Sequence, residues 1–373
     1  MNIVCNTAAL LDAVSTVSHA VSGKSTLPAL EGILLRAGGS SLYLAGYDME
    51  LGITTSIEAQ VKEVGDIVLS VKLFGDIVRN LPGELVTLST DEKMNVKIQS
   101  GMADYEIMGI SAAEYPEIPT VPDGVGFVVP RATLRSMIRQ TIFAVSQVDS
   151  SRPVHKGTLF EIHNKMLNLV SLDGARLALR SEPIQSEENM QFVIPRKTLV
   201  ELLKMLDDED APTSIVVGKR HVLIEVNGYV MISRLLDGEF LSYRKAIPQQ
   251  VTTTIRVNTR ELMQSVSRAA IVINDRVKSP LICQFHNQQI KISCATPLGS
   301  ASDVMGAAID GKEEMMSFNH QFLMEALKNT ETDEVRIELN GSQNPMKILP
   351  PEGDSFLFLV LPVRMPGGAR HGG

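Results

Sequence analysis

The sequence contains no tryptophan, and only 5% of its 373 residues are aromatic. Proteins that bind single-stranded nucleic acid stack the bases on aromatic side chains, so this composition argues against that mode of binding. Cysteine is scarce as well. Three cysteines, Cys5, Cys283 and Cys294, make no disulfide framework in so long a chain and are typical of a reducing compartment.

Long apolar runs are absent too. No stretch approaches the ~20 uninterrupted apolar residues of a membrane span, and the N-terminus lacks a basic region followed by an apolar one. We therefore expect a soluble, cytoplasmic protein without a membrane partner. With 44% hydrophobic and 21% charged residues, the chain should fold throughout, and its length predicts two or three domains.

A catalytic motif is also missing. Residues 23–26, Gly-Lys-Ser-Thr, look like the end of a phosphate-binding loop, but the first glycine of such a loop is replaced by Ser18. His155 and His163 have no serine or cysteine nearby in a nucleophile setting. The acidic cluster 207–210 precedes a proline and is typical of a solvated loop. We expect no catalytic residues, and so no enzyme.

The sequence gives only weak support for a metal site, because the motif is again incomplete. Cys283, His286 and Cys294 have suitable side chains but lack a second closely spaced ligand pair. Their alternating pattern places them on strands, which favours buried thiols. We expect neither metal nor cofactor.

What the sequence does contain is an internal repeat. A short apolar run, then Asn, Ser or Pro, then an amphipathic stretch recurs six times at intervals of 60 to 65 residues. An Asn or Ser side chain caps a helix, and proline suits its first turn, so each copy predicts a strand followed by a helix. Period-two runs after each helix predict antiparallel hairpins. The predicted helices are 6–21, 70–81, 130–143, 195–206, 258–272 and 319–330.

The similarity is stronger when the units are taken in pairs. Asp48 recurs as Asp173, and residues 112–119 resemble residues 236–248. The prediction is an α+β protein of three tandem repeated domains, each made of two strand-helix-sheet units. Segments rich in proline, glycine and polar residues separate them. The predicted domains are 1–120, 126–248 and 253–366, with a flexible tail at 367–373.

Charge is distributed unevenly over this pattern. The predicted helices hold eleven Lys and Arg against five Asp and Glu, a charge of +6, whereas the whole chain carries −8. If the helices share one face, that face attracts a polyanion while the rest repels it. The alternative is a set of ordinary solvated helix faces, and the first helix has no Lys or Arg.

Five separated segments of the chain are similar in sequence to a known protein family. They are 22–30, 171–178, 193–197, 237–244 and 359–365, and their order and spacing resemble the beta subunit family of bacterial DNA polymerase III, the sliding clamps. The resemblance covers residues 1 to about 365 and implies a non-catalytic processivity factor. It further implies a head-to-tail homodimer, closed as a ring with helices inside and antiparallel sheets outside, that encircles duplex DNA without sequence specificity.

The family also implies partners and site residues. A clamp loader, DNA polymerases and repair proteins would dock through short clamp-binding peptides, in a nucleoid-associated cytoplasmic setting. Phosphate-facing positions matched to the family are Lys24, Arg196 and Lys197; helix charge adds Arg131, Arg135, Arg139 and Lys204. The implied peptide pocket comprises Gly174, Arg176, Leu177, Leu241, Lys245, Ala246, Leu361, Pro362, Val363 and Arg364, and the implied dimer contact comprises Tyr105, Ile107, Ile271 and Val272.

Several positions depart from the family's pattern. Leu172, Ala175, Leu241 and Lys245 replace residue types that are frequent in the pocket, so the peptide preference stays open. Near the dimer contact, basic and acidic residues that are frequent in the family are both replaced: Met102 and Asp104 on one side, residues 298–302 on the other. We expect a dimer interface that is less sensitive to salt than one held by ion pairs. The alternative function is a repeat-built protein-protein scaffold that does not encircle DNA.

Overall fold

The computed structural model describes residues 1–148, 152–273 and 279–363. The chain forms two compact units. Unit 1 combines Met1–Leu134 with Lys197–Leu235, and unit 2 combines Arg135–Arg196 with the chain from Leu236 onward. The boundary between the units therefore passes through the second predicted domain. Some strands of this domain join the sheet of the first predicted domain, and the others join a sheet of the third.

Unit 1 is built on one twelve-stranded antiparallel sheet. Its main path runs β8-β7-β6-β1-β4-β16-β15-β14-β9, with β3 on β4, β2 on β3, and β5 on β2. The pairing of Leu51–Thr54 with Val230–Ser233 joins the strands of the first and second predicted domains. The strands are β1 (Asn2–Asn6), β2 (Gly32–Gly38), β3 (Ser41–Tyr47), β4 (Leu51–Glu63), β5 (Gly65–Ser70), β6 (Leu85–Thr90), β7 (Asn95–Ser100), β8 (Ala103–Met108), β9 (Val125–Pro130), β14 (Pro212–Val217), β15 (His221–Val226) and β16 (Tyr229–Arg234).

Unit 2 holds a nine-stranded sheet, β13-β10-β11-β12-β25-β24-β23-β17-β21, and a four-stranded one, β20-β19-β18-β22. The pairing of β12 with β25 joins the second and third predicted domains. The strands are β10 (Gly157–His163), β11 (Met166–Leu172), β12 (Arg176–Pro183), β13 (Met190–Pro195), β17 (Thr253–Asn258), β18 (Leu281–His286), β19 (Gln289–Thr296), β20 (Gly299–Gly306), β21 (Ala308–Gly311), β22 (Glu314–Phe318), β23 (Glu334–Leu339), β24 (Met346–Leu349) and β25 (Phe356–Val360).

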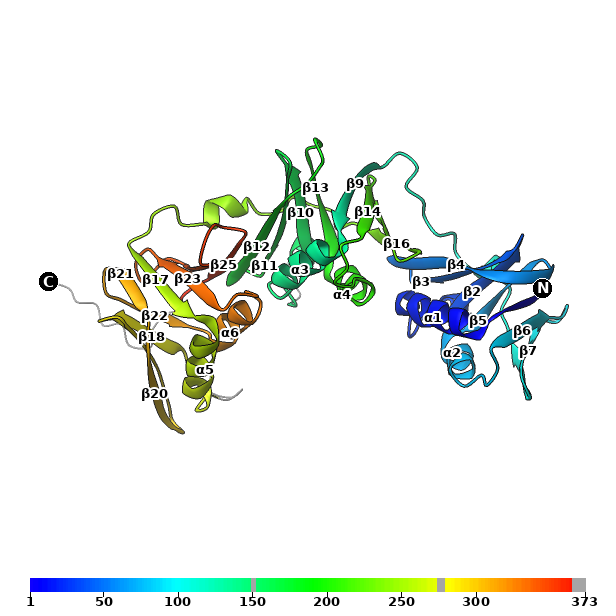
Figure 1. Cartoon of the computed structure of the whole chain (residues 1–373), viewed down its shortest axis with the longest axis horizontal. Helices are drawn as coiled ribbons and strands as arrows, with labels where there is room; N and C mark the ends of the chain where they lie inside the picture. Colours follow the sequence, from blue (N-terminus) through cyan, green and yellow to red (C-terminus); the bar gives the residue numbers. More distant parts are fainter. Residues whose placement is uncertain (149–151, 274–278, 364–373) are drawn as a thin grey trace. The chain divides into compact units, whose positions relative to one another are not determined.

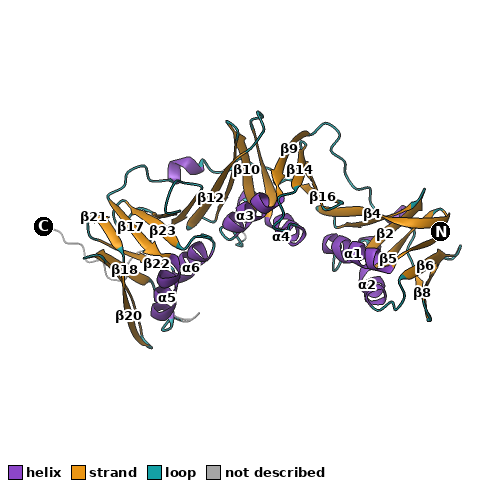
Figure 2. Ribbon diagram, viewed as in Figure 1, coloured by secondary structure: helices purple, strands orange, loops and turns teal. Residues whose placement is uncertain are grey.

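Each predicted helix exists and lies within its predicted range. Two of them, α1 and α2, pack together in unit 1, and α5 and α6 pack together in unit 2 (Figures 1 and 2). Apolar residues at helical spacing, such as Leu262, Val266 and Ala269, turn one face of α5 into the core. The helices are α1 (Thr7–Val17), α2 (Val71–Arg79), α3 (Arg131–Ile142), α4 (Arg196–Met205), α5 (Thr259–Ala270) and α6 (His320–Lys328), and the short 3₁₀ helices are η1 (Ser18–Ala20), η2 (Pro28–Glu31), η3 (Ala112–Glu114), η4 (Pro153–Lys156) and η5 (Tyr243–Ala246).

The predicted asparagine caps are confirmed. The side chains of Asn6, Asn258 and Asn319 each accept a hydrogen bond from a backbone N–H of the following helix at 2.9 to 3.0 Å. The two prolines do not occupy the first helical turn. Pro130 and Pro195 instead end strands β9 and β13, because each pairs with a neighbouring strand.

A backbone contact repeats once in each predicted domain. The first N–H of α1 donates to the carbonyl of Glu84, that of α3 to Ala211, and that of α5 to Asp333, at 2.8 to 2.9 Å. Each carbonyl belongs to the residue just before a strand: β6, β14 and β23. The same junction is thus built three times, as a tandem repeat requires.

Candidate functional site

Several residues of the predicted peptide pocket lie where β12 meets β25. Arg176 pairs with Val360 and Leu177 with Leu359 in antiparallel register. Beyond the end of β25, the N–H of Leu361 donates to the carbonyl of Ala175 at 2.9 Å. The loop that precedes β12 and the segment that follows β25 therefore lie side by side.

The segment that follows β25 is held on its other side by β22. The N–H of Val363 donates to the carbonyl of Ser317 at 2.8 Å, and the Ser317 hydroxyl donates back to the Val363 carbonyl at 2.6 Å. Leu361 and Val363 nevertheless remain 38% and 39% exposed. The backbone is fixed while two apolar side chains face solvent. Arg364 lies outside the described residues.

A third part of the site is the connector that contains η5. Tyr243 is buried, whereas Lys245 and Ala246 are exposed and Leu241 is 41% exposed. Tyr243 joins a cluster with Leu172, Leu177 and Leu359, and Phe240 and Ile247 pack against it. The connector thus covers the core beneath the pocket.

Leu177 is 4% exposed and belongs to this core. Three other residues of the predicted pocket, Leu241, Leu361 and Val363, have exposed apolar side chains. Exposed apolar side chains of this kind suit the binding of a short apolar peptide.

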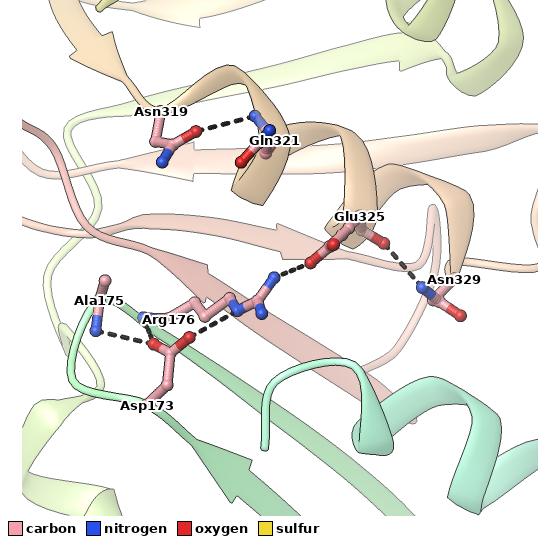
Figure 3. Close-up of polar contacts among 7 residues, drawn as sticks. All are labelled: Asp173, Ala175, Arg176, Asn319, Gln321, Glu325 and Asn329. Carbon is pink, nitrogen blue, oxygen red and sulfur yellow. Dashed lines mark hydrogen bonds and ion pairs between the residues drawn. The ribbon is translucent and has the colours of Figure 1, made fainter. Parts of the chain in front are cut away.

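Arg176 is turned into the protein. Its Nε donates to Asp173 at 2.9 Å, and its Nη1 contacts Glu325 of α6 (Figure 3). Its guanidinium lies 4.6 Å from the ring centre of Phe322 and 5.7 Å from that of Phe143. With 7% of the residue exposed, Arg176 ties the pocket loop to α6 and has little freedom to contact a ligand.

Asp173 shapes the same loop. One carboxylate oxygen accepts the N–H groups of Ala175 and Arg176 at 2.9 and 3.1 Å (Figure 3). Asp48, its predicted counterpart in the repeat, accepts those of Glu50 and Leu51 at 3.0 and 2.8 Å. Gly174 adopts a φ of +92° in the middle of the loop, a conformation that favours glycine.

Glu161 on β10 anchors the connector. Its carboxylate accepts two hydrogen bonds from Arg244, at 2.9 and 2.5 Å, and one from the Tyr243 hydroxyl at 2.7 Å. Burial raises the pKa of Glu161, but these hydrogen bonds and that from Asn168 outweigh it and hold the pKa below its ordinary value. The two residues before Lys245 and Ala246 are therefore fixed.

The predicted phosphate-facing cations differ in their freedom. Lys24 lies in the exposed loop between η1 and η2, and no ion pair joins it to a residue within 1–148, 152–273 or 279–363. Lys197 contacts Asp48, and Lys204 lies 2.7 Å from Glu201, yet both side chains are about half exposed. Flexible, half-exposed lysines can exchange a carboxylate for a phosphate.

The arginines of this set are more restrained. The Arg131 side chain is 13% exposed and bonds to Asp207 at 2.7 Å, so it holds α3 to the acidic loop. Arg139 is 52% exposed and lies 4.0 Å from Glu331. Arg135 also interacts within the chain, and Nε of Arg196 is buried without a hydrogen bond partner among the described residues.

The predicted dimer residues lie on two edges. Ile107 is 9% exposed, and Tyr105 is partly buried, on β8, the last strand of the path in unit 1. Ile271, just beyond α5, is 78% exposed, whereas Val272 packs partly against the core of unit 2. Tyr105 and Ile271 are thus the more accessible members of the predicted contact.

Sequence reasoning missed the carboxylates that organise these surfaces. Glu161 looked like an ordinary strand residue, and Glu325 like a solvated helix residue. Glu325 is 149 positions from Arg176, so no local pattern connects them. The spacing of Glu161 from Tyr243 and Arg244 does not predict their contact either, because only the fold brings β10 to the connector.

The other sequence signals fall outside these sites. Residues 18–20 form a 3₁₀ helix, so no strand leads into residues 23–26 as a phosphate-binding loop requires. Cys5, Cys283 and Cys294 are buried free thiols. Within the described ranges, no group of three His, Cys, Asp or Glu side chains is placed to hold a metal ion. No helix in that part of the chain is long and apolar enough to cross a membrane.

Tandem α+β domains, with paired helices and antiparallel sheets that continue across the domain junctions, define the class of DNA clamps. Models of the DNA polymerase III beta subunit match this chain in order: the N-terminal domain at residues 1–119, the central domain at 128–241 and the C-terminal domain at 244–364. The chain belongs to the DNA polymerase III beta subunit family.

Relatives agree along almost the whole length. A beta sliding clamp of Bacillus subtilis is 32% identical over 95% of this chain and 97% of its own. A crystal structure of the DNA polymerase sliding clamp from Bacillus subtilis superposes with a TM-score of 0.95 at 31% identity, covering 98% of this chain and all of that one. One from Pseudomonas aeruginosa, bound to griselimycin, has a TM-score of 0.93 at 27% identity, covering 98% and 100%.

The chain is therefore a sliding clamp, a non-catalytic accessory subunit that confers processivity on a DNA polymerase. The expected fold of three tandem clamp domains is confirmed.

Proposed function

We propose that this chain closes head to tail with a second copy around duplex DNA. Three domains per chain and two chains would then present twelve helices to the DNA, with the sheets outside. The match of all three domain models in order is the observation that carries this proposal. The predicted domains 1–120, 126–248 and 253–366 would be its repeating parts, and 367–373 its tail.

The proposed DNA contacts are diffuse. Lys24, Lys197, Lys204 and Arg139 are the exposed cations best suited to touch phosphates, and Arg135 and Arg196 complete the proposed set. Arg131 is better suited to holding Asp207. Because flexible cations contact phosphates without reading bases, the ring would hold DNA and still slide.

We further propose that the clamp loader and polymerases dock peptides on the surface formed by Gly174, Leu177, Leu241, Lys245, Ala246, Leu361, Pro362, Val363 and Arg364. Support comes from the three exposed apolar side chains of Leu241, Leu361 and Val363. Arg176 would not contact the peptide but would hold the loop before β12 in place, since its guanidinium is already paired with Asp173 and Glu325.

Retention on circular DNA tests encirclement. The protein is loaded onto a nicked circular plasmid by a clamp loader and passed through a sizing column in high salt. A ring stays with the circle and leaves after the plasmid is cut once. Equal loss from circular and linear DNA would contradict encirclement and favour a scaffold that does not enclose DNA.

A further inference from the structure

A cluster of positive charge lies on unit 1 away from its helices. The turn between β14 and β15 carries Lys219 and Arg220, and His221 begins β15. His221 stands directly opposite Arg234 in the antiparallel pair, and the Arg220 carbonyl accepts the N–H of Leu235 at 2.8 Å. We call Lys219, Arg220, His221 and Arg234 the basic turn.

Two acidic residues lie near the basic turn: Glu50, whose backbone carbonyl accepts the N–H of Arg234 at 2.8 Å, and Asp123. No ion pair links Lys219, Arg220 or Arg234 to a carboxylate anywhere in the three described stretches, and all three are exposed. Burial first, and then the charges of Arg234 and Arg220, lower the pKa of His221. Because this lowered pKa leaves His221 neutral near pH 7, the positive charge of the basic turn comes from Lys219, Arg220 and Arg234.

A hollow of about 350 Å³ lies beside the basic turn. Residues 120–123 of the first connector line it together with residues 218–221. A Cβ on Gly218 or on Gly124 would come within 2.7 Å of a Val121 methyl group, so the missing side chains let Val121 pack against the turn. The hollow has an apolar wall, Val121 and Pro122, and a basic rim.

We propose that the basic turn and this hollow bind an acidic peptide segment of a partner protein. Arg220, Arg234 and Lys219 would hold carboxylates, while an apolar side chain of the peptide rests on Val121 and Pro122. The observations favour a peptide over nucleic acid. Asp123 lies in the lining and repels a continuous phosphate backbone, whereas a peptide can alternate charged and apolar groups.

This surface shares no residue with the proposed pocket around Leu361, so it extends the function to a second docking point. The peptide test below needs neither DNA nor a loader, and its result stands whether or not the ring forms.

A fluorescent peptide of alternating Asp and Leu is the first probe, and fluorescence anisotropy is the measurement. Its controls are the same peptide with Asn for Asp and a single-stranded oligonucleotide of matched charge. We expect the acidic peptide to bind and the Asn peptide to bind at least about tenfold more weakly. Equal binding of both peptides, or tighter binding of the oligonucleotide, overturns the proposal.

The double variant Arg220→Gln with Arg234→Gln keeps the aliphatic stems and removes two charges. We expect an affinity loss of about tenfold or more. Lys62→Gln with Lys93→Gln removes two exposed charges elsewhere on unit 1 and should stay within about twofold. An equal loss of affinity in both double variants would show that only the net charge matters, and would overturn the proposed site.

Thermal unfolding separates binding from folding. Because Arg220 and Arg234 are exposed and form no ion pair within the described residues, the double Gln variant should melt close to the parent protein. A clear fall in melting temperature would make these arginines structural and overturn the proposal. Gly218→Ala is a second test, because it displaces Val121 and leaves every charge in place. We expect it to lower the affinity for the acidic peptide. An unchanged affinity would exclude the hollow from the binding site.

Discussion

At the scale of single residues, Glu161 is the group on which the connector depends. Replacing it by Gln leaves Arg244 and Tyr243 without their charged acceptor, and we expect a loss of about 2 kcal/mol in the free energy of unfolding. Urea denaturation measures it. Glu352→Gln is the matched control, because Glu352 pairs with Arg256 but its side chain is 82% exposed; it should cost almost nothing. Equal costs in the two variants would contradict the anchoring role.

The pH dependence of stability gives a second measure of Glu161. Its pKa is lower in the folded chain than its ordinary value of 4.5, so its contribution is complete above that value and is lost as the pH falls through the folded pKa. The parent protein should therefore lose stability more steeply than Glu161→Gln below about pH 5. Parallel curves would show that the carboxylate charge contributes nothing.

Arg176 should tolerate no simple replacement. Lysine keeps the charge but cannot contact Asp173 and Glu325 together while covering the Phe322 ring. We expect Arg176→Lys to cost about 3 kcal/mol because it leaves buried polar groups poorly paired. Arg256→Lys at the exposed pair is the control and should change stability little. A loss below about 1 kcal/mol would mean that solvent replaces these contacts.

At the scale of elements, the asparagine caps set where helices begin. Asn258→Ala removes the acceptor for the N–H of Glu261 and should destabilise the protein by about 1 kcal/mol. Ser70 precedes α2 without capping it by a side-chain hydrogen bond, so Ser70→Ala is a matched control with an expected cost near zero. Chemical denaturation of both variants checks this. If the serine change costs as much, the cap is not the cause.

The same elements show how far sequence reasoning reached. Helices at 60 to 65 residue intervals, the hairpins and the repeat of Asp48 at Asp173 follow from periodicity and capping, which are local properties. The two prolines were misplaced because strand pairing, which depends on distant residues, extends β9 and β13 through them. The pocket residues came from the resemblance, while Glu161 and Glu325 escaped because their partners are far apart in the chain.

At the scale of the whole molecule, the proposed ring depends on the contact between two edges. Some charges near both edges already have partners: Asp104 lies 3.2 Å from Lys97, and Asp303 lies 2.6 Å from Arg268. Among the charges on β8, Glu106 is exposed and has no ion-pair partner within the described residues. The other accessible groups at these edges include apolar and aromatic side chains: Met102 is 101% exposed, Met108 68% and Ile271 78%, with Tyr105 partly exposed.

An apolar contact and an ionic one respond oppositely to salt. Added salt screens ion pairs, but it leaves the burial of apolar surface unweakened. We expect light scattering to give a mass near twice 40.7 kDa, and the dimer dissociation constant to change less than about threefold between low and high salt. Ile271→Asp should weaken the dimer by more than about tenfold, because it buries a charge at the contact.

Val128→Asp is the control for that change, since Val128 is 54% exposed on β9, at the opposite end of the sheet path from β8, and belongs to no predicted contact. A dissociation constant that rises steeply with salt would contradict the apolar contact, while a mass of one chain under all conditions would contradict the dimer itself. In the second case the three-domain fold would stand, but the chain would hold partners without enclosing DNA.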